Sequence, residues 1–171
     1  LWSLFPAFAN WPSDASDAFP LIAKDLGNAL SSRIDLQGPI CEGLKRLIRQ
    51  GRIGAGVYEV DDDDDAGDGA STIAAGEPND EHMPASFTVD VAEAQLAAVS
   101  KYARNFLPIL FNLFVSSPTA RRGALSHTIG AFAKVTDQAQ LAGFFRTVLR
   151  KLVKVTADDP GAPDALVEGG D

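Results

Sequence analysis

Few residues of this 171-residue chain could do chemistry at a catalytic or metal centre. His82, His127 and the lone Cys41 are too few to build a structural zinc site. Ser126 and His127 are adjacent, and neighbouring residues of a helix point about 100° apart, so they cannot act as a nucleophile and its base. A single cysteine excludes an internal disulfide and fits a reducing compartment.

Two stretches have the composition of ligand-binding loops but not their order of residues. The stretch "GRIGAG" lacks the Lys-Ser/Thr pair of a phosphate-binding loop and follows no predicted strand. The stretch "DDDDDAGDG" does not place its acids, glycine and glutamate in the order of an EF-hand calcium loop. We therefore predict that the chain is not an enzyme and takes no cofactor, no metal and no small-molecule substrate.

The basic residues suggest a different chemistry, the binding of phosphate groups. Arg121 and Arg122 fall at the start of a predicted helix, where the helix dipole disfavours cations, so local stability does not explain them. A helix N-terminus that carries two arginines is well suited to hold an anion or an RNA backbone.

A second basic group lies further along the chain, in a helix predicted over residues 137–155. Its bases span an arc of about 140° on a helical wheel, opposite an apolar side. Such an arc is also typical of a helix face that is merely solvated, and both interpretations stay open. The predicted RNA-binding or partner-binding residues are Arg121, Arg122, Lys134, Arg146, Arg150, Lys151 and Lys154.

The net charge of −8 is unevenly distributed. Residues 53–100 hold 12 of the 23 acids and no Lys or Arg. Residues 101–157 hold nine bases and the single acid Asp137, a net charge of +8. Overall acidity therefore does not exclude a nucleic-acid partner, because the positive charge is gathered in one segment.

Apolar residues recur at helical spacing in almost every segment, and no run alternates like a strand. We predict a short helix at "WSLFPAFA", a helix over 14–31 with Ser13 as N-cap, and a third that Asp35 caps and Gly51 ends. Further helices are predicted over 90–105, 106–115, 120–134 and 137–155.

The helix predicted over 106–115 is apolar nearly all round. Ten residues are too few to cross a membrane, which takes about 20, and we predict no membrane segment. We expect this helix to be covered by neighbours on both sides, with Asn105 as its N-cap and Pro108 in its first turn.

Four regions follow from these patterns. Residues 1–52 and 89–157 are predicted to be helical, the second with a basic face. Residues 53–88 form an acidic insertion rich in Gly, Ala and Asp, which we expect to be disordered because it can bury too little apolar surface. The tail at 158–171 is expected to be disordered or truncated.

Antiparallel helix pairs joined by tight turns predict an all-α fold, an α-solenoid of the HEAT or armadillo kind. "LFPAF" and "FLPIL" each place a proline inside an aromatic helix, and each is followed by a turn and a longer amphipathic helix. The roughly 135 residues outside the insertion would make about three repeats of HEAT length.

The stretches "LFPAF…P.D…FP..AK.LG.AL..R.DL" and "A.NFLPILFNLF" resemble the ribosomal-RNA-processing protein twelve family. The resemblance extends over residues 1–52 and 92–155. The opening "LWSLFPAF" has neither a basic start nor a small-residue cleavage site, so we expect an internal piece of a longer protein.

The resemblance implies a non-enzymatic HEAT-repeat scaffold of ribosome biogenesis, located in the nucleus and nucleolus. It implies pre-ribosomal particles as partners, through pre-ribosomal RNA, ribosomal proteins or assembly proteins, and a Ran-type GTPase. The alternative is a protein-binding solenoid of the transport-receptor kind, which would contact a GTPase or basic cargo through the acidic insertion. Deletion of residues 57–86 would abolish binding only in the second case.

Overall fold

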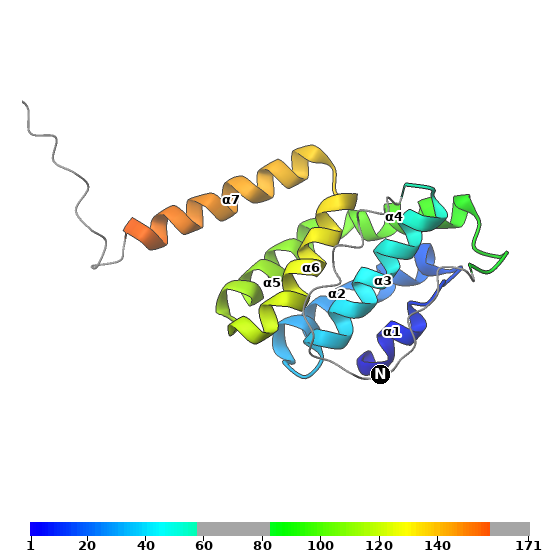
Figure 1. Ribbon diagram of the computed structural model, residues 1–171, viewed down its shortest axis with the longest axis horizontal. Coiled ribbons are helices and arrows are strands. Elements are labelled where there is room, and N and C mark those ends of the chain that lie inside the picture. Colours follow the sequence, from blue (N-terminus) through cyan, green and yellow to red (C-terminus); the bar gives the residue numbers. More distant parts are fainter. Residues whose placement is uncertain (58–82, 158–171) are drawn as a thin grey trace, which may run out of the picture. The chain divides into compact units, whose positions relative to one another are not determined.

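The computed structural model describes residues 1–57 and 83–157, except the side chains of residues 151, 152 and 154–157, and each regular element within these ranges is a helix (Figure 1). The elements in chain order are the 3-10 helix η1 (Trp2–Leu4), α1 (Phe5–Phe8), α2 (Ala15–Ser32), α3 (Gln37–Gly54), α4 (Val89–Lys101), α5 (Ala103–Ser116), α6 (Thr119–Val135) and α7 (Gln138–Ala157). The all-α prediction is confirmed. Of the insertion expected to be disordered over residues 53–88, Ile53 and Gly54 belong to α3, and Phe87 is buried at 1% exposure. Residues 58–82 of that insertion and the tail at 158–171 lie outside the described residues.

The chain divides into two compact units, Leu1–Asp137 and Gln138–Asp171. The first unit contains η1 and α1 to α6. The second is described as the single amphipathic helix α7, in which Phe144 and Phe145 contact each other with ring centroids 5.8 Å apart.

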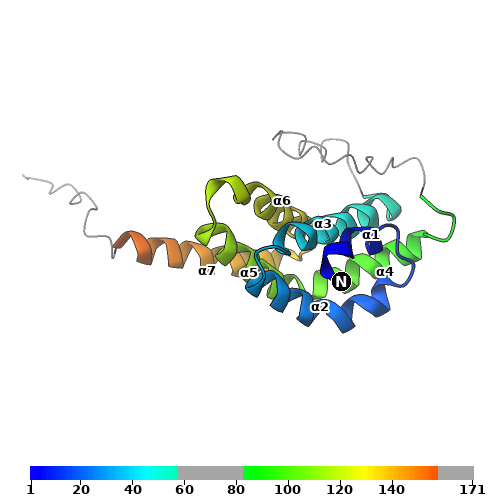
Figure 2. The same ribbon diagram turned by 90° about the horizontal axis from the view of Figure 1, so that it is seen from below.

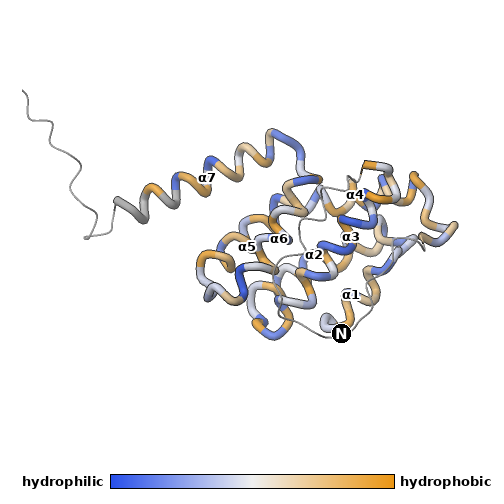
Figure 3. The backbone as a smooth tube through the Cα atoms, in the orientation of Figure 1, coloured by the Kyte–Doolittle hydropathy of each residue, from blue (hydrophilic) through white to orange (hydrophobic). Residues whose placement is uncertain are grey.

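The first unit is built from two layers of helices. Helices α2, α4 and α5 form one layer, and α3 and α6 form the other (Figure 2). Hydrophobic and hydrophilic residues alternate along the helices, so each one buries a stripe between the layers (Figure 3). This arrangement of helix pairs is the α-solenoid that the sequence predicts.

Aromatic side chains join the first layer to α6. Phe19 of α2 lies 6.1 Å from Phe106 of α5, and Phe106 stacks on Phe132 of α6 at 5.5 Å between ring centroids. All three side chains are almost completely buried. Helix α5 is therefore covered by α2 and by α6, as its composition predicts.

Helices in the same layer run in the same direction. In the second layer, Cys41 of α3 lies against Thr128 of α6. Arg52 and Lys134, which lie in the last turns of the same two helices, line one hollow, so α3 and α6 run in the same direction. Between the layers the direction reverses, since later residues of α3 meet earlier residues of α4. The Gln95 side chain of α4 donates to the Leu47 carbonyl, 2.6 Å away, and a Cβ on Gly54 would lie 2.8 Å from Ala92. Parallel alignment within layers and antiparallel pairing between them are what stacked helical repeats produce.

The predicted end of α3 at Gly51 is wrong, because the helix continues to Gly54. Gly51 is buried, and a Cβ on it would lie 2.7 Å from the Leu96 side chain of α4. The glycine with the left-handed conformation is Gly56, at φ 69°. Gly51 thus allows α3 and α4 to pack closely and does not form a turn.

Three predicted N-caps are also wrong. Helix α2 begins after Asp14, so Ser13 lies outside it, and Asn105 lies inside α5. Asp35 accepts from Arg33 at 2.8 Å, and these hydrogen bonds lower the pKa of the exposed carboxyl. Thr88 caps α4, its hydroxyl accepting from the Val91 backbone N–H at 3.4 Å.

The prolines reveal a different pairing of repeats from the one expected. Pro108 is the sixth residue of α5, beyond its first turn, and Pro20 is the sixth residue of α2. Both are exposed, so the carbonyl that each proline leaves without a helical donor faces water. The counterpart of "FLPIL" is therefore "AFPLI" of α2, while "LFPAF" forms the short α1, which packs on α3.

Candidate functional site

The structure separates the roles of Arg121 and Arg122 in the first turn of α6. Arg121 is exposed. Arg122 is half-buried, its Nε donates to the Ser117 carbonyl at 2.9 Å, and its guanidinium lies 5.5 Å from the centre of the Phe114 ring. Ser117 is the residue that follows α5, so Arg122 stabilises the α5–α6 turn, and of the two arginines only Arg121 is fully presented to a ligand.

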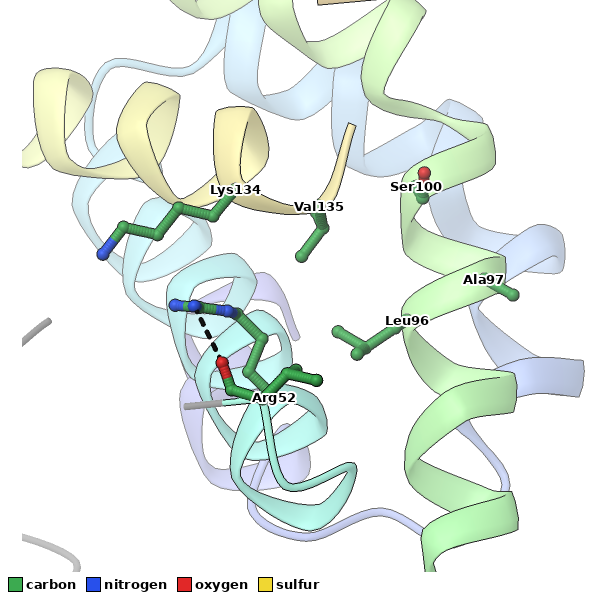
Figure 4. Close-up of a pocket in the computed structure, with 7 residues that line it drawn as sticks. Arg52, Leu96, Ala97, Ser100, Lys134 and Val135 are labelled. Atoms are coloured by element: carbon green, nitrogen blue, oxygen red, sulfur yellow. Dashed lines mark hydrogen bonds between the residues drawn. The ribbon is translucent and has the colours of Figure 1, made fainter. Parts of the chain in front are cut away.

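Lys134 lies in the last turn of α6, beside a residue that the sequence predictions left out. Lys134 is exposed and lines an open hollow of about 260 Å³ together with Arg52 of α3 (Figure 4). The opposite wall comes from α4 and includes Leu96 and Ser100. The Arg52 guanidinium donates to the Val57 carbonyl at 3.0 Å, which holds the side chain against the end of α3.

The remaining predicted residues lie on α7. Arg146 and Arg150 are exposed, and the side chains of Lys151 and Lys154 lie outside the described residues. Because α7 belongs to the second unit, these four bases are described separately from Arg121, Arg122 and Lys134 of the first unit. The predicted set is therefore divided between the two units.

Four bases of α3 were missed as candidates. Lys45, Arg46, Arg49 and Arg52 recur at helical spacing in "GLKRLIRQGR", a signal that could have identified them. Glu42 lies 3.5 Å from both Lys45 and Arg46, and Arg46 also donates to the Pro6 carbonyl at 3.0 Å, which ties α1 to α3.

Charge is segregated between the two layers. Helices α3 and α6 together hold seven bases and the single acid Glu42, a net charge of +6. Helices α2, α4 and α5 hold three bases and four acids, a net charge of −1. The positive field of the first unit therefore comes from one layer, and half of it comes from α3.

The other residues considered for chemistry do not form a reactive site. The Ser126 hydroxyl donates to the Gly123 carbonyl at 2.9 Å, whereas the adjacent His127 is exposed on the surface of α6. Burial raises the pKa of the Cys41 thiol. A hydrogen bond with the Thr128 hydroxyl lowers this pKa, but by less than burial raises it. His82 lies outside the described residues.

The described ranges offer neither a metal-binding cluster nor a membrane-spanning helix. Residues 1–57 and 83–157 contain no cluster of three or more His, Cys, Asp or Glu side chains placed to hold a metal ion. Within the same ranges, no helix has both the length and the apolar character that a membrane span requires.

Comparison with known proteins identifies similar chains. The family model described as "Ribosomal RNA-processing protein 12, HEAT repeats" matches residues 1–117. The "RRP12-like protein" of Gallus gallus is 28% identical over 158 residues, 89% of this chain and 9% of that protein. The "RRP12-like protein" of Homo sapiens is 27% identical over 164 residues, 93% of this chain and 10% of that protein.

A yeast protein extends the comparison. "Ribosomal RNA-processing protein 12" of Saccharomyces cerevisiae is 24% identical over 152 residues, 86% of this chain and 11% of that protein. The chain thus spans about a tenth of the length of the curated relatives it matches, from 9% to 11% in these three. No solved structure matches it.

Proposed function

This chain belongs to the family described as "Ribosomal RNA-processing protein 12, HEAT repeats", and from that premise we propose that it is a non-enzymatic scaffold segment of ribosome biogenesis. Its proposed task is to bind pre-ribosomal RNA, or proteins assembled on it, during processing and maturation of the subunits. The names of the relatives, which refer to ribosomal RNA processing, support this proposal.

The observation that carries the proposal is exposed positive charge in each of the two units. Repeat solenoids bind partners along extended surfaces, and phosphate backbones are bound by Lys and Arg. Exposed Arg121, Lys134, Arg146 and Arg150 supply such cations, and the described residues contain no convergent set of titratable groups that would favour catalysis.

The proposed partners are pre-ribosomal particles, and the proposed location is the nucleus and nucleolus. Both follow from the task, because ribosomal RNA is processed there. A Ran-type GTPase is a second proposed partner. It would bind this chain if the chain acts as a protein-binding solenoid of the transport-receptor kind.

The proposal predicts that the fragment binds RNA with a strong salt dependence. Binding of the 171-residue chain to a fluorescent precursor ribosomal RNA fragment is measured across a series of salt concentrations. The variant changes five of the predicted bases to Gln: Arg121, Arg146, Arg150, Lys151 and Lys154. Arg122 is kept because it stabilises the α5–α6 turn. Each phosphate contact contributes about 0.7 to 0.9 to the log–log salt slope, so we expect a loss of about 4 units if all five make contact.

Circular dichroism shows whether the variant keeps its helices, and a chain with Lys24, Lys101 and Arg104 changed to Gln controls for lost charge elsewhere. An RNA affinity that does not change with salt in the wild type contradicts the proposal. Protein binding that disappears on deletion of residues 57–86, without RNA binding, supports the transport-receptor alternative instead.

A further inference from the structure

A surface formed by α3 and α6 carries the positive charge of the first unit. We define the basic face as Lys45, Arg49 and Arg52 of α3 and Lys134 of α6. The three α3 residues are spaced four and three apart, so they lie along one side of that helix, and hydrophilic positions recur along it (Figure 3). Arg52 and Lys134 meet at the hollow where α3 and α6 end (Figure 4).

The basic face lies on the outer side of its layer. The opposite side of α3 packs inward through Leu44, Leu47 and Ile48, which are nearly inaccessible. Lys134 is exposed, whereas Lys45, Arg49 and Arg52 are half-buried, and the Lys45 side chain keeps 26% of its accessible surface. Each of the four cations, which come from two helices separate in sequence, thus reaches solvent.

Small residues are exposed on the side of α6 that carries Lys134. Gly123 and Gly130 are exposed, and a Cβ added at either would meet nothing within 4 Å. His127, also exposed, is the larger side chain between them. A partner's backbone can approach α6 closely at the two glycines.

The basic face also carries few of the side chains on which folded protein partners depend. Protein interfaces are held by buried aromatic and aliphatic anchors. Among the described residues, the strongly exposed large apolar side chains lie outside α3 and α6, and Val57, 53% exposed, is the one of them that lines the hollow with Arg52 and Lys134. A surface of four cations with one exposed aliphatic side chain and no exposed aromatic fits a polyelectrolyte better than a globular protein.

We infer that the basic face binds the phosphate backbone of RNA, with Arg49, Arg52 and Lys45 on α3 and Lys134 on α6 as the contacts. The inference rests on the proposed function and adds a site on α3, which the predicted residue set does not include. Glu42 is the acid of α3 beside this face, and the net charge of +6 over α3 and α6 outweighs it.

The test compares two triple variants of the full chain. One changes Lys45, Arg49 and Lys134 to Gln in the basic layer. The other changes Lys24, Lys101 and Arg104, all exposed in the opposite layer, so that both lose the same charge. The probe is fluorescent oligouridine over a salt series, with polyglutamate as competitor. We expect only the first variant to lose about 2 units of salt slope, since each single-strand phosphate contact contributes roughly 0.7.

Several results would overturn the inference, and they differ from failure of the proposed function. If both triple variants lose the same salt slope, RNA binding depends on net charge alone and not on the basic face. If the basic-face variant binds like the wild type while the five-base variant of Arg121 and α7 loses binding, the fragment binds RNA elsewhere. No RNA binding by the wild type rejects both the site and the RNA role of this fragment. Unfolding midpoints measured for each variant separate lost contacts from lost structure.

Discussion

Three glycines of α3 set how closely this helix approaches its neighbours. A Cβ on Gly43 would collide with the Phe5 ring of α1, and one on Gly51 would lie 2.7 Å from Leu96 of α4. A Cβ on Gly54 would lie 2.8 Å from the Cβ of Ala92, an atom fixed to the α4 backbone. Helix α3 therefore carries glycines where its neighbours leave no room for a side chain, despite their cost to helix stability.

We expect Gly54→Ala to destabilise the protein by about 1–3 kcal/mol, because α3 and α4 must move apart to accept the methyl group. Gly130→Ala is the matched control in α6, where an added Cβ meets nothing within 4 Å. It should stabilise by about 0.5–1 kcal/mol through helix propensity. Urea unfolding measures both changes, and a Gly54→Ala protein as stable as the wild type would show that the two helices are not in tight contact.

At the scale of elements, a charged side chain stabilises the turn between α5 and α6. The Ser117 carbonyl at the end of α5 accepts from Arg122, and Ser117 itself is buried. The guanidinium above the Phe114 ring adds a cation–π contact. The neighbouring Arg121 is exposed, so two adjacent arginines with the same sequence context have different roles.

Arg122→Gln should lower the free energy of unfolding by about 1–3 kcal/mol, since a charge-assisted hydrogen bond and the ring contact are both lost. Arg121→Gln should change it by less than about 0.5 kcal/mol, as is usual for exposed residues. Thermal unfolding of both single variants tests the difference. If the two variants were equally stable, the contact of Arg122 with Ser117 would contribute nothing, and both arginines would be available for RNA.

At the scale of the whole molecule, α3 links the core to the charged surface. Its inner side packs between the layers, its outer side carries the basic face, and Cys41 near its start is 1% exposed. The Cys41 thiol lies against Thr128 of α6, inside the basic layer. Reagents can reach it only when α3 and α6 separate, so this thiol reports how cooperatively the first unit opens.

Burial raises the pKa of the Cys41 thiol, which gives the pH dependence a definite sign. The stabilisation is complete below the unfolded thiol pKa of about 8.5 and is lost as pH rises through the folded value. Relative to Cys41→Ala, we expect the wild type to lose up to about 1.4 kcal/mol per pH unit between the unfolded and the folded thiol pKa, and nothing further above the folded value. Urea unfolding at several pH values measures this difference. Identical pH profiles, or labelling of native Cys41 as fast as a free thiol, would contradict the buried position.

The helices were predictable from the sequence because their signal is local. Apolar residues three and four apart identify a buried face without knowledge of its partner, and Phe19, Leu26, Leu44 and Phe132 are buried as that spacing predicts. The family resemblance was also present in the sequence, in stretches such as "FLPILFNLF". Ends of helices were less predictable, since Gly51 and Asn105 have the residue types of caps but lie inside helices.

Only the tertiary structure decided which helices share a layer. Arg52 and Lys134 are far apart in sequence and meet because α3 and α6 pack in parallel, a relation that no local pattern contains. The sequence by itself located positive charge in residues 101–157, and packing added the bases of α3 to it while directing Arg122 inward. The physical reason is that periodicity depends on residues a few positions apart, whereas a surface depends on which distant helices bury their apolar sides against each other.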